Sequence, residues 1–138
     1  MSALDPGRRG LVLVAWDGSE TGRRALLHAA RVVGRGGSVA VVNVLPAQSI
    51  GSRLQTVSDE ARAEQWSILE QAAVLLAHSG VHAELIAATG DPLAEIAATA
   101  KRLHAETVVV GRSGGRRLHG RVADRLVRRG GPDVLVVH

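Results

Sequence analysis

The sequence predicts an α/β fold, a parallel β-sheet with helices on both faces. Two observations lead to this prediction. Short apolar runs alternate with amphipathic helical patterns along the chain, and one apolar run, Thr107 to Val110, leads directly into the glycine-rich residues 111–114 (GRSG). Such a junction presents backbone N–H groups at the carboxyl edge of a sheet, where anions and nucleotides bind.

Five short strands are expected: Leu11 to Ala15, Ser38 to Val44, Val81 to Ala88, Thr107 to Val110 and Val134 to Val137. In the third, His82 and Glu84 alternate with apolar neighbours, as in a strand at the edge of a sheet. Residues 1–10 are expected to form a flexible N-terminal segment, and Leu45 to Val57 a long loop. The length of 138 residues is typical of one domain, predicted to span residues 1–138.

Four helices are expected between the strands. Ser19 and Asp91 are the expected N-caps of the first and third, and Pro92 follows at the first helical position. The helices run from Ser19 to about Val33, from about Ser58 to His78, from Pro92 to about Leu103 and from about Arg121 to Arg129. The two tryptophans, Trp16 and Trp66, are more typical of core or interface packing than of ligand stacking.

The composition narrows the classes of partner. The net charge is +4, and between Arg112 and Arg129 seven arginines face one acid, Asp124, which suits an anionic ligand. Phe and Tyr are absent, so the stacked aromatic platforms that bind single-stranded nucleic acid are not expected. No apolar run reaches the roughly 20 residues needed to span a bilayer, the first ten residues have no apolar signal region, and cysteine is absent. A cytoplasmic protein without a membrane partner is therefore expected.

Five segments, in this order and spacing, resemble the universal stress protein family across essentially the whole chain. They are residues 14–19 (VAWDGS), 43–44 (NV), 90–92 (GDP), 109–114 (VVGRSG) and 132–137 (PDVLVV). The resemblance implies a Rossmann-like, five-stranded parallel sheet of strand order 3-2-1-4-5, with a crevice between strands 1 and 4, where the order reverses. It also implies a homodimer that pairs through Val134 to Val137, a β-branched edge strand that needs covering, and further protein partners of unknown identity.

Many family members bind ATP or AMP in this crevice through Gly-x2-Gly-x9-Gly followed by Ser or Thr. By resemblance, the adenine and ribose side is formed by Ala15, Trp16, Asp17 and Val44. Val110, Gly111 and Gly114 form the part of the site under the nucleoside and the first phosphate. Gly120, Arg121 and Val122 form the start of a helix that holds the terminal phosphates. Mg²⁺ is expected only as a counter-ion of the nucleotide, and the protein itself is expected to have no metal site.

The glycine loop departs from the family pattern. Only five residues separate Gly114 from Gly120, and Arg121 stands where the family has Ser or Thr. Two interpretations stay open. Arg116, Arg117 or Arg121 contacts phosphate in place of the hydroxyl, or the loop is remodelled and the protein is a dimeric interaction module that binds no nucleotide.

Catalytic chemistry finds little support in the sequence. Residues 111–115 fit G-x-S-x-G, but only Asp124 or Asp133 and then His138 follow, and the chain is too short for a hydrolase sheet. The Walker A pattern is absent and no general base stands near the loop. No catalytic residue is predicted, and at most a very slow ATPase is expected of a stress-response or regulatory protein of this kind.

Overall fold

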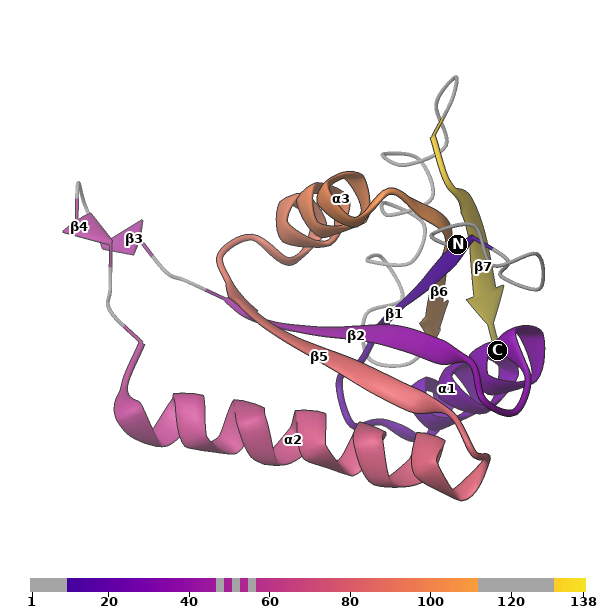
Figure 1. Cartoon of the computed structure of the whole chain (residues 1–138). Helices are drawn as coiled ribbons and strands as arrows, with labels where there is room; N and C mark the ends of the chain where they lie inside the picture. Colours follow the sequence, from indigo (N-terminus) through magenta and orange to yellow (C-terminus); the bar gives the residue numbers. More distant parts are fainter. Residues whose placement is uncertain (1–9, 47–48, 51–52, 55–56, 112–130) are drawn as a thin grey trace.

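The computed structural model describes residues 10–46, 49–50, 53–54, 57–111 and 131–138. Five parallel strands form one sheet in the order β5-β2-β1-β6-β7 (Figure 1). Their bounds are Leu11–Ala15 (β1), Ser38–Leu45 (β2), His82–Thr89 (β5), Ala105–Gly111 (β6) and Asp133–Val137 (β7). Numbered along this sheet alone, that order is 3-2-1-4-5, so the predicted topology and the edge position of the third strand are confirmed.

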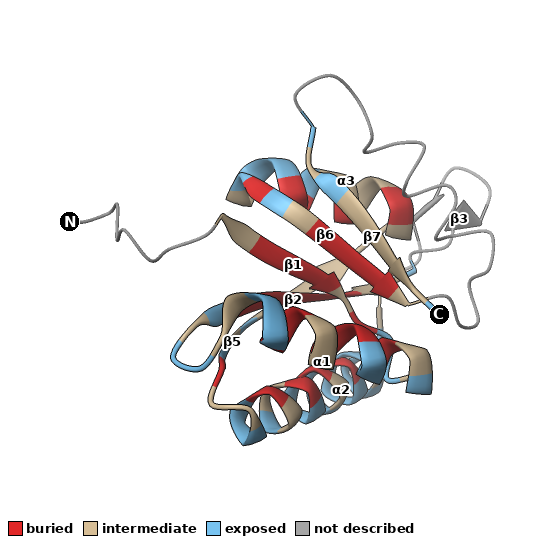
Figure 2. Cartoon of the chain, turned by 90° about the vertical axis from the view of Figure 1, so that its right-hand side faces the viewer, coloured by how far each residue is buried: buried red, intermediate tan, exposed pale blue. Residues whose placement is uncertain are grey.

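Three described helices cover the two faces of this sheet. They are Glu20–Val33 (α1), Asp59–His78 (α2) and Pro92–Leu103 (α3). Figure 2 shows α1 and α2 side by side on one face and α3 on the other, each with its buried stripe turned toward the strands. None of the helices in the described part of the chain is both long enough and apolar enough to cross a membrane.

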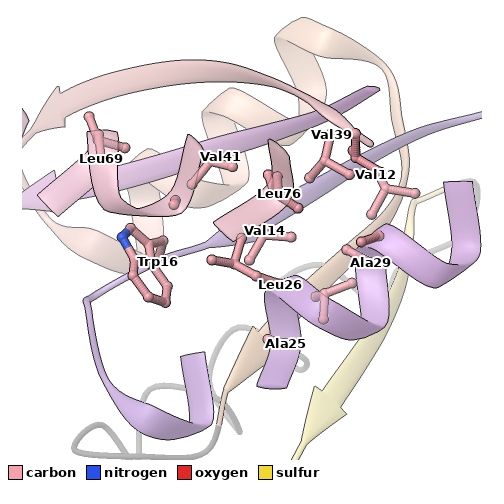
Figure 3. Packing of buried hydrophobic residues seen from close by; sticks show 14 residues of the cluster. Val12, Val14, Trp16, Ala25, Leu26, Ala29, Val39, Val41, Leu69 and Leu76 are labelled. Carbon is pink, nitrogen blue, oxygen red and sulfur yellow. The ribbon is translucent and has the colours of Figure 1, made fainter. Parts of the chain in front are cut away.

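Side chains that alternate along the strands build one core on each face. Val12, Val14 and Val41 pack under α1 and α2 together with Leu26 and Leu69 (Figure 3). Strand residues that face the other way form the second core together with α3. It consists of Leu13, Ala40, Val42, Leu93, Ile96, Ala100, Ala105, Val108 and Val110. Strands buried on both faces explain the near-continuous apolar runs in the sequence.

Side-chain caps begin each of these helices. The Ser19 hydroxyl accepts a hydrogen bond from the Gly22 N–H at 3.0 Å, and the Ser58 hydroxyl accepts one from Ala61 at 3.1 Å. Asp91 Oδ2 accepts one from the Ala94 N–H at 2.8 Å. The predicted starts of the first three helices are therefore confirmed, because each cap satisfies an N–H that lacks a partner within its own helix.

In two places the structure differs from the sequence prediction by more than one residue at the end of a strand. The segment from Leu45 to Val57 was predicted as a loop, but it contains the short antiparallel pair Ser49–Ile50 (β3) and Arg53–Leu54 (β4), which lies apart from the main sheet (Figure 1). The strand β6 is longer than the predicted Thr107 to Val110, because Ala105 also pairs with β1 and Gly111 pairs with β7. The predicted helix from Arg121 to Arg129 and nearly all of the predicted N-terminal segment lie outside the described residues.

Candidate functional site

The end of β1 marks the point where the strand order reverses. The registered pairs between β1 and β2 end at Ala15–Val42, and those between β1 and β6 end at Ala15–Val110. Beyond these pairs the chain turns at Trp16 into the start of α1, whereas β2 continues for three more residues, to Leu45. Ligands of open α/β sheets bind at such a switch point.

The three apolar residues predicted for the site share one face of the sheet. Ala15, Val44 and Val110 all belong to the α3 side. Val110 is buried, and Ala15 and Val44 are half-buried. The structure therefore brings these three residues of β1, β2 and β6 together near the carboxyl edge.

The side chain of Trp16 packs in the core under α2 (Figure 3). Its exposed fraction is 4%, and its indole Nε1 donates a hydrogen bond to the Ile68 carbonyl at 2.7 Å. The main chain of Trp16 stays at the edge of the sheet, where its N–H donates to the Val42 carbonyl at 2.9 Å. The side chain therefore has the packing role that the sequence predicts. Only the main chain of Trp16 is placed to take part in the predicted site.

Asp17 is exposed at the same edge. Its Oδ1 accepts a hydrogen bond from the Ser19 N–H at 2.9 Å, which holds the turn before α1. Its Oδ2 has no hydrogen-bond partner within the described ranges and can accept one from a ligand. In the part of the chain that the structure describes, no group of three or more His, Cys, Asp or Glu could hold a metal ion.

Gly111 closes the other side of the switch point. A Cβ atom at this position would lie 2.8 Å from the Gly22 amide nitrogen and 2.9 Å from the Thr21 carbonyl oxygen. The end of β6 thus approaches the first turn of α1 more closely than any side chain allows. Gly114, Gly120, Arg121 and Val122, the remaining predicted site residues, lie outside the described residues.

Two buried amides at this edge were not predicted as functional. Asn43 Nδ2 donates to the Trp16 carbonyl at 2.7 Å, and Gln65 Nε2 donates to the carbonyls of Asn43 and Ala88, each at 2.9 Å. Gln65 is 1% exposed, and its Oε1 has no partner among the described residues. Leaving a buried acceptor unpaired costs about 1–3 kcal/mol of stability. The favourable contribution of this amide therefore comes from its two donated hydrogen bonds.

The sequence contained a signal for Gln65. Together with Leu69, Ala72 and Leu76 it has the spacing of a single helix face, and all four residues are buried. A glutamine on such a stripe indicates a polar group that must find partners inside the protein. Asn43, in a strand that is otherwise apolar after Ser38, is a weaker signal of the same kind.

Solved structures with the same architecture come from several organisms. The universal stress protein from Archaeoglobus fulgidus in complex with dAMP is 25% identical, with a TM-score of 0.75, and the match covers 94% of this chain and 98% of that chain. A universal stress protein family protein from Arabidopsis thaliana with AMP bound is 19% identical, with a TM-score of 0.66 and coverage of 94% and 91%.

A protein from Mycobacterium tuberculosis is 26% identical, with a TM-score of 0.61 and coverage of 94% of both chains. No curated protein sequence matches this chain significantly. The sequence profile of the universal stress protein family matches residues 9–138, almost the entire length. The topology, the cores on both faces of the sheet and this match lead to one conclusion: the chain belongs to the universal stress protein family.

Proposed function

We propose that this chain is a cytosolic stress-response or regulatory protein that binds an adenine nucleotide, ATP or AMP, at the switch point between β1 and β6. Binding rather than turnover is the proposed activity, and Mg²⁺ enters only as the counter-ion of a triphosphate. Complexes of two structural relatives with dAMP and AMP support the choice of ligand class. The main-chain geometry at Val44 is the observation that carries the proposal for this chain.

Val44 lies two residues beyond the last registered pair between β2 and β1. Successive residues of a strand direct their main-chain N–H and C=O groups to opposite neighbouring strands, so residues two apart direct them to the same side. Because the Val42 carbonyl accepts from Trp16, the corresponding groups of Val44 are directed to the same side, past the end of β1. The N–H and C=O of a single residue offer a donor and an acceptor on the same side of the strand, which suits the edge of a purine ring.

Asp17 supplies the complementary contact for the sugar. Its Oδ2 is a carboxyl oxygen at an exposed turn, two residues beyond the end of β1. Ribose hydroxyls are donors that a carboxylate at a switch point accepts well. Gly111 brings the end of β6 against the first turn of α1, so its main chain borders the same switch point.

We further propose that two copies pair through β7. This strand is the last in the sheet order, so its outer edge has no neighbouring strand among the described residues. Its side chains, Val134 to Val137, are half-buried and apolar. An apolar edge strand of this kind requires a covering partner, and a second copy of β7 provides one. Sedimentation at micromolar concentration should show a dimer, whereas a clean monomer contradicts this part of the proposal.

Calorimetric titration with AMP and with ATP, in the presence and absence of Mg²⁺, tests the nucleotide site. Saturable binding is expected from the wild-type protein, and Asp17→Ala is expected to weaken it at least about tenfold, the factor that corresponds to about 1.4 kcal/mol. Asp17→Asn keeps an acceptor for the Ser19 N–H and so preserves the turn while removing the charge. It should weaken binding without loss of stability.

Asp59→Ala is the matched control, because Asp59 is an exposed acid in the first turn of another helix, α2. It should bind as the wild type does. Absence of heat at millimolar nucleotide contradicts the proposed function. Equal affinity of wild type and Asp17→Ala contradicts the assigned position of the ribose.

A further inference from the structure

A closed set of hydrogen bonds surrounds the turn that leaves β1. Trp16 donates from its indole to α2, at the Ile68 carbonyl, and accepts at its own carbonyl from Asn43 on β2. Gln65 on α2 in turn donates to the Asn43 carbonyl. We call these residues, Trp16, Asn43, Gln65 and Ile68, the amide ring. It links three elements through polar groups that are almost entirely buried.

Asn43 changes what the end of β1 can bind. In a continued parallel ladder, the Trp16 carbonyl would accept from the N–H of Val44, two residues past Val42. The side chain of Asn43 donates to that carbonyl instead, at 2.7 Å. The turn at Trp16 and Asp17 is therefore held by a side chain, and no main-chain hydrogen bond joins Val44 to Trp16 in the described part of the chain.

Gln65 contacts β2 on the side that faces β5. Its amide bridges carbonyls of β2 and β5, at Asn43 and Ala88, just where β2 continues without β1. A leucine or methionine at position 65 would complete the apolar face of α2. It would also avoid the unpaired buried oxygen that Gln65 leaves at Oε1. The amide thus serves to hold the extended ends of β2 and β5 in place rather than to fill the core.

We propose that Asn43 and Gln65 are positioning residues of the nucleotide site. They hold the Trp16–Asp17 turn and the end of β2 at the separation in which the main-chain groups of Val44 and the Asp17 carboxylate can contact one ligand. This inference rests on the proposed function. It adds that affinity depends on two buried side chains on the α1 and α2 side of the sheet, away from the face that Val44 lines.

The experiment compares AMP affinity in Asn43→Ala and Gln65→Met with the wild type. Each variant removes donors of the amide ring, and each is expected to bind AMP about tenfold more weakly, the effect of about one lost hydrogen bond. Gln71→Met is the matched control, because Gln71 is exposed on the same helix. Asn43→His restores a side-chain N–H donor and should recover most of the affinity.

A spectroscopic signal separates positioning from stability. Trp66→Phe removes the half-exposed indole and leaves Trp16 as the only tryptophan. In this background AMP should change the Trp16 emission, and Asn43→Ala should abolish the change. Urea unfolding of every variant identifies conditions in which it is fully folded, and affinities are compared only there. Asn43→Ala alters β2 and Gln65→Met alters α2. If one of the two variants does not fold, the other still tests the proposal.

The outcomes distinguish the two proposals. Weaker binding by both folded variants, with Gln71→Met unchanged, supports the positioning role. Wild-type affinity in folded Asn43→Ala and Gln65→Met overturns the positioning role and leaves the proposed function standing. Absence of AMP binding by the wild type overturns both.

Discussion

Gly111, the last residue of β6, lies directly against the main chain of Gly22 in the first turn of α1. A Cβ atom at Gly111 would come within 2.8 Å of the Gly22 nitrogen. Gly22 is itself enclosed, because a Cβ there would meet Asp17 Oδ1 at 3.0 Å and Trp16 Cε3 at 3.1 Å. The two glycines therefore set how closely β6, the start of α1 and the Asp17 turn approach one another at the switch point.

This contact predicts that Gly111→Ala is more harmful than Gly22→Ala. The new methyl group of Gly111→Ala meets main-chain atoms that cannot rotate away, so we expect a loss of about 1–3 kcal/mol in the free energy of unfolding. In Gly22→Ala the neighbours are side-chain atoms, and the helical preference for alanine offsets part of the crowding. Urea unfolding of both variants measures the difference, and equal stabilities contradict the predicted contact.

The fold could be predicted because most of its helices and strands have recognisable local sequence signals. Ser19, Ser58 and Asp91 were recognisable as helix starts, and continuous apolar strands indicated a sheet covered on both faces. The β3–β4 pair was missed because each of its strands is two residues long, too short to show a period. The strand order came from resemblance to a family, since local patterns do not specify which strands are neighbours.

The candidate site was only partly predictable. Asp17 and Gly111 stand out in sequence because a turn acid and a glycine follow apolar runs. The connection of Trp16 through Asn43 to Gln65 spans residues far apart in the chain, and its hydrogen bonds depend on the depth at which α2 packs. Such a relationship exists only in the folded protein, and a pattern within one segment cannot reveal it.

Replacement of His104, the residue that caps the C-terminus of α3, should stabilise the protein. His104 has φ 54° and ψ 46°, a left-handed conformation that costs a residue with a Cβ roughly 1 kcal/mol. Its side chain is exposed, so His104→Gly relieves this cost while the main-chain hydrogen bond to Lys101 is kept. We expect a gain of about 0.5–1 kcal/mol on thermal or urea unfolding. His104→Ala keeps the Cβ and should show no such gain, and a matching gain there contradicts the explanation.

Truncation of two apolar residues of α2 should change stability by very different amounts. Leu69 is fully buried in the core under α1 and α2, and Leu69→Ala is expected to cost about 2–5 kcal/mol through lost contacts and a cavity. Val74 is 57% exposed on the same helix, and Val74→Ala should change stability by less than about 0.5 kcal/mol. Chemical denaturation of the two variants checks the burial of α2, and similar losses would mean that the helix packs in another orientation.

Gln65→Glu should make stability depend on pH in a way that the wild type does not. The introduced carboxyl is placed where Gln65 is 1% exposed and faces two carbonyl oxygens, so burial raises its pKa in the folded state above the unfolded value of about 4.3. The folded variant then binds more protons than the unfolded one, and its stability falls as pH rises from about 4.3 through the raised pKa. Below that window the protonated carboxyl is neutral and can donate one hydrogen bond, so the deficit relative to wild type is smallest there. Urea midpoints measured between pH 4 and pH 8 provide the test, with Gln71→Glu, exposed on the same helix, as the control. A constant difference between Gln65→Glu and wild type across this range contradicts the buried position of the amide.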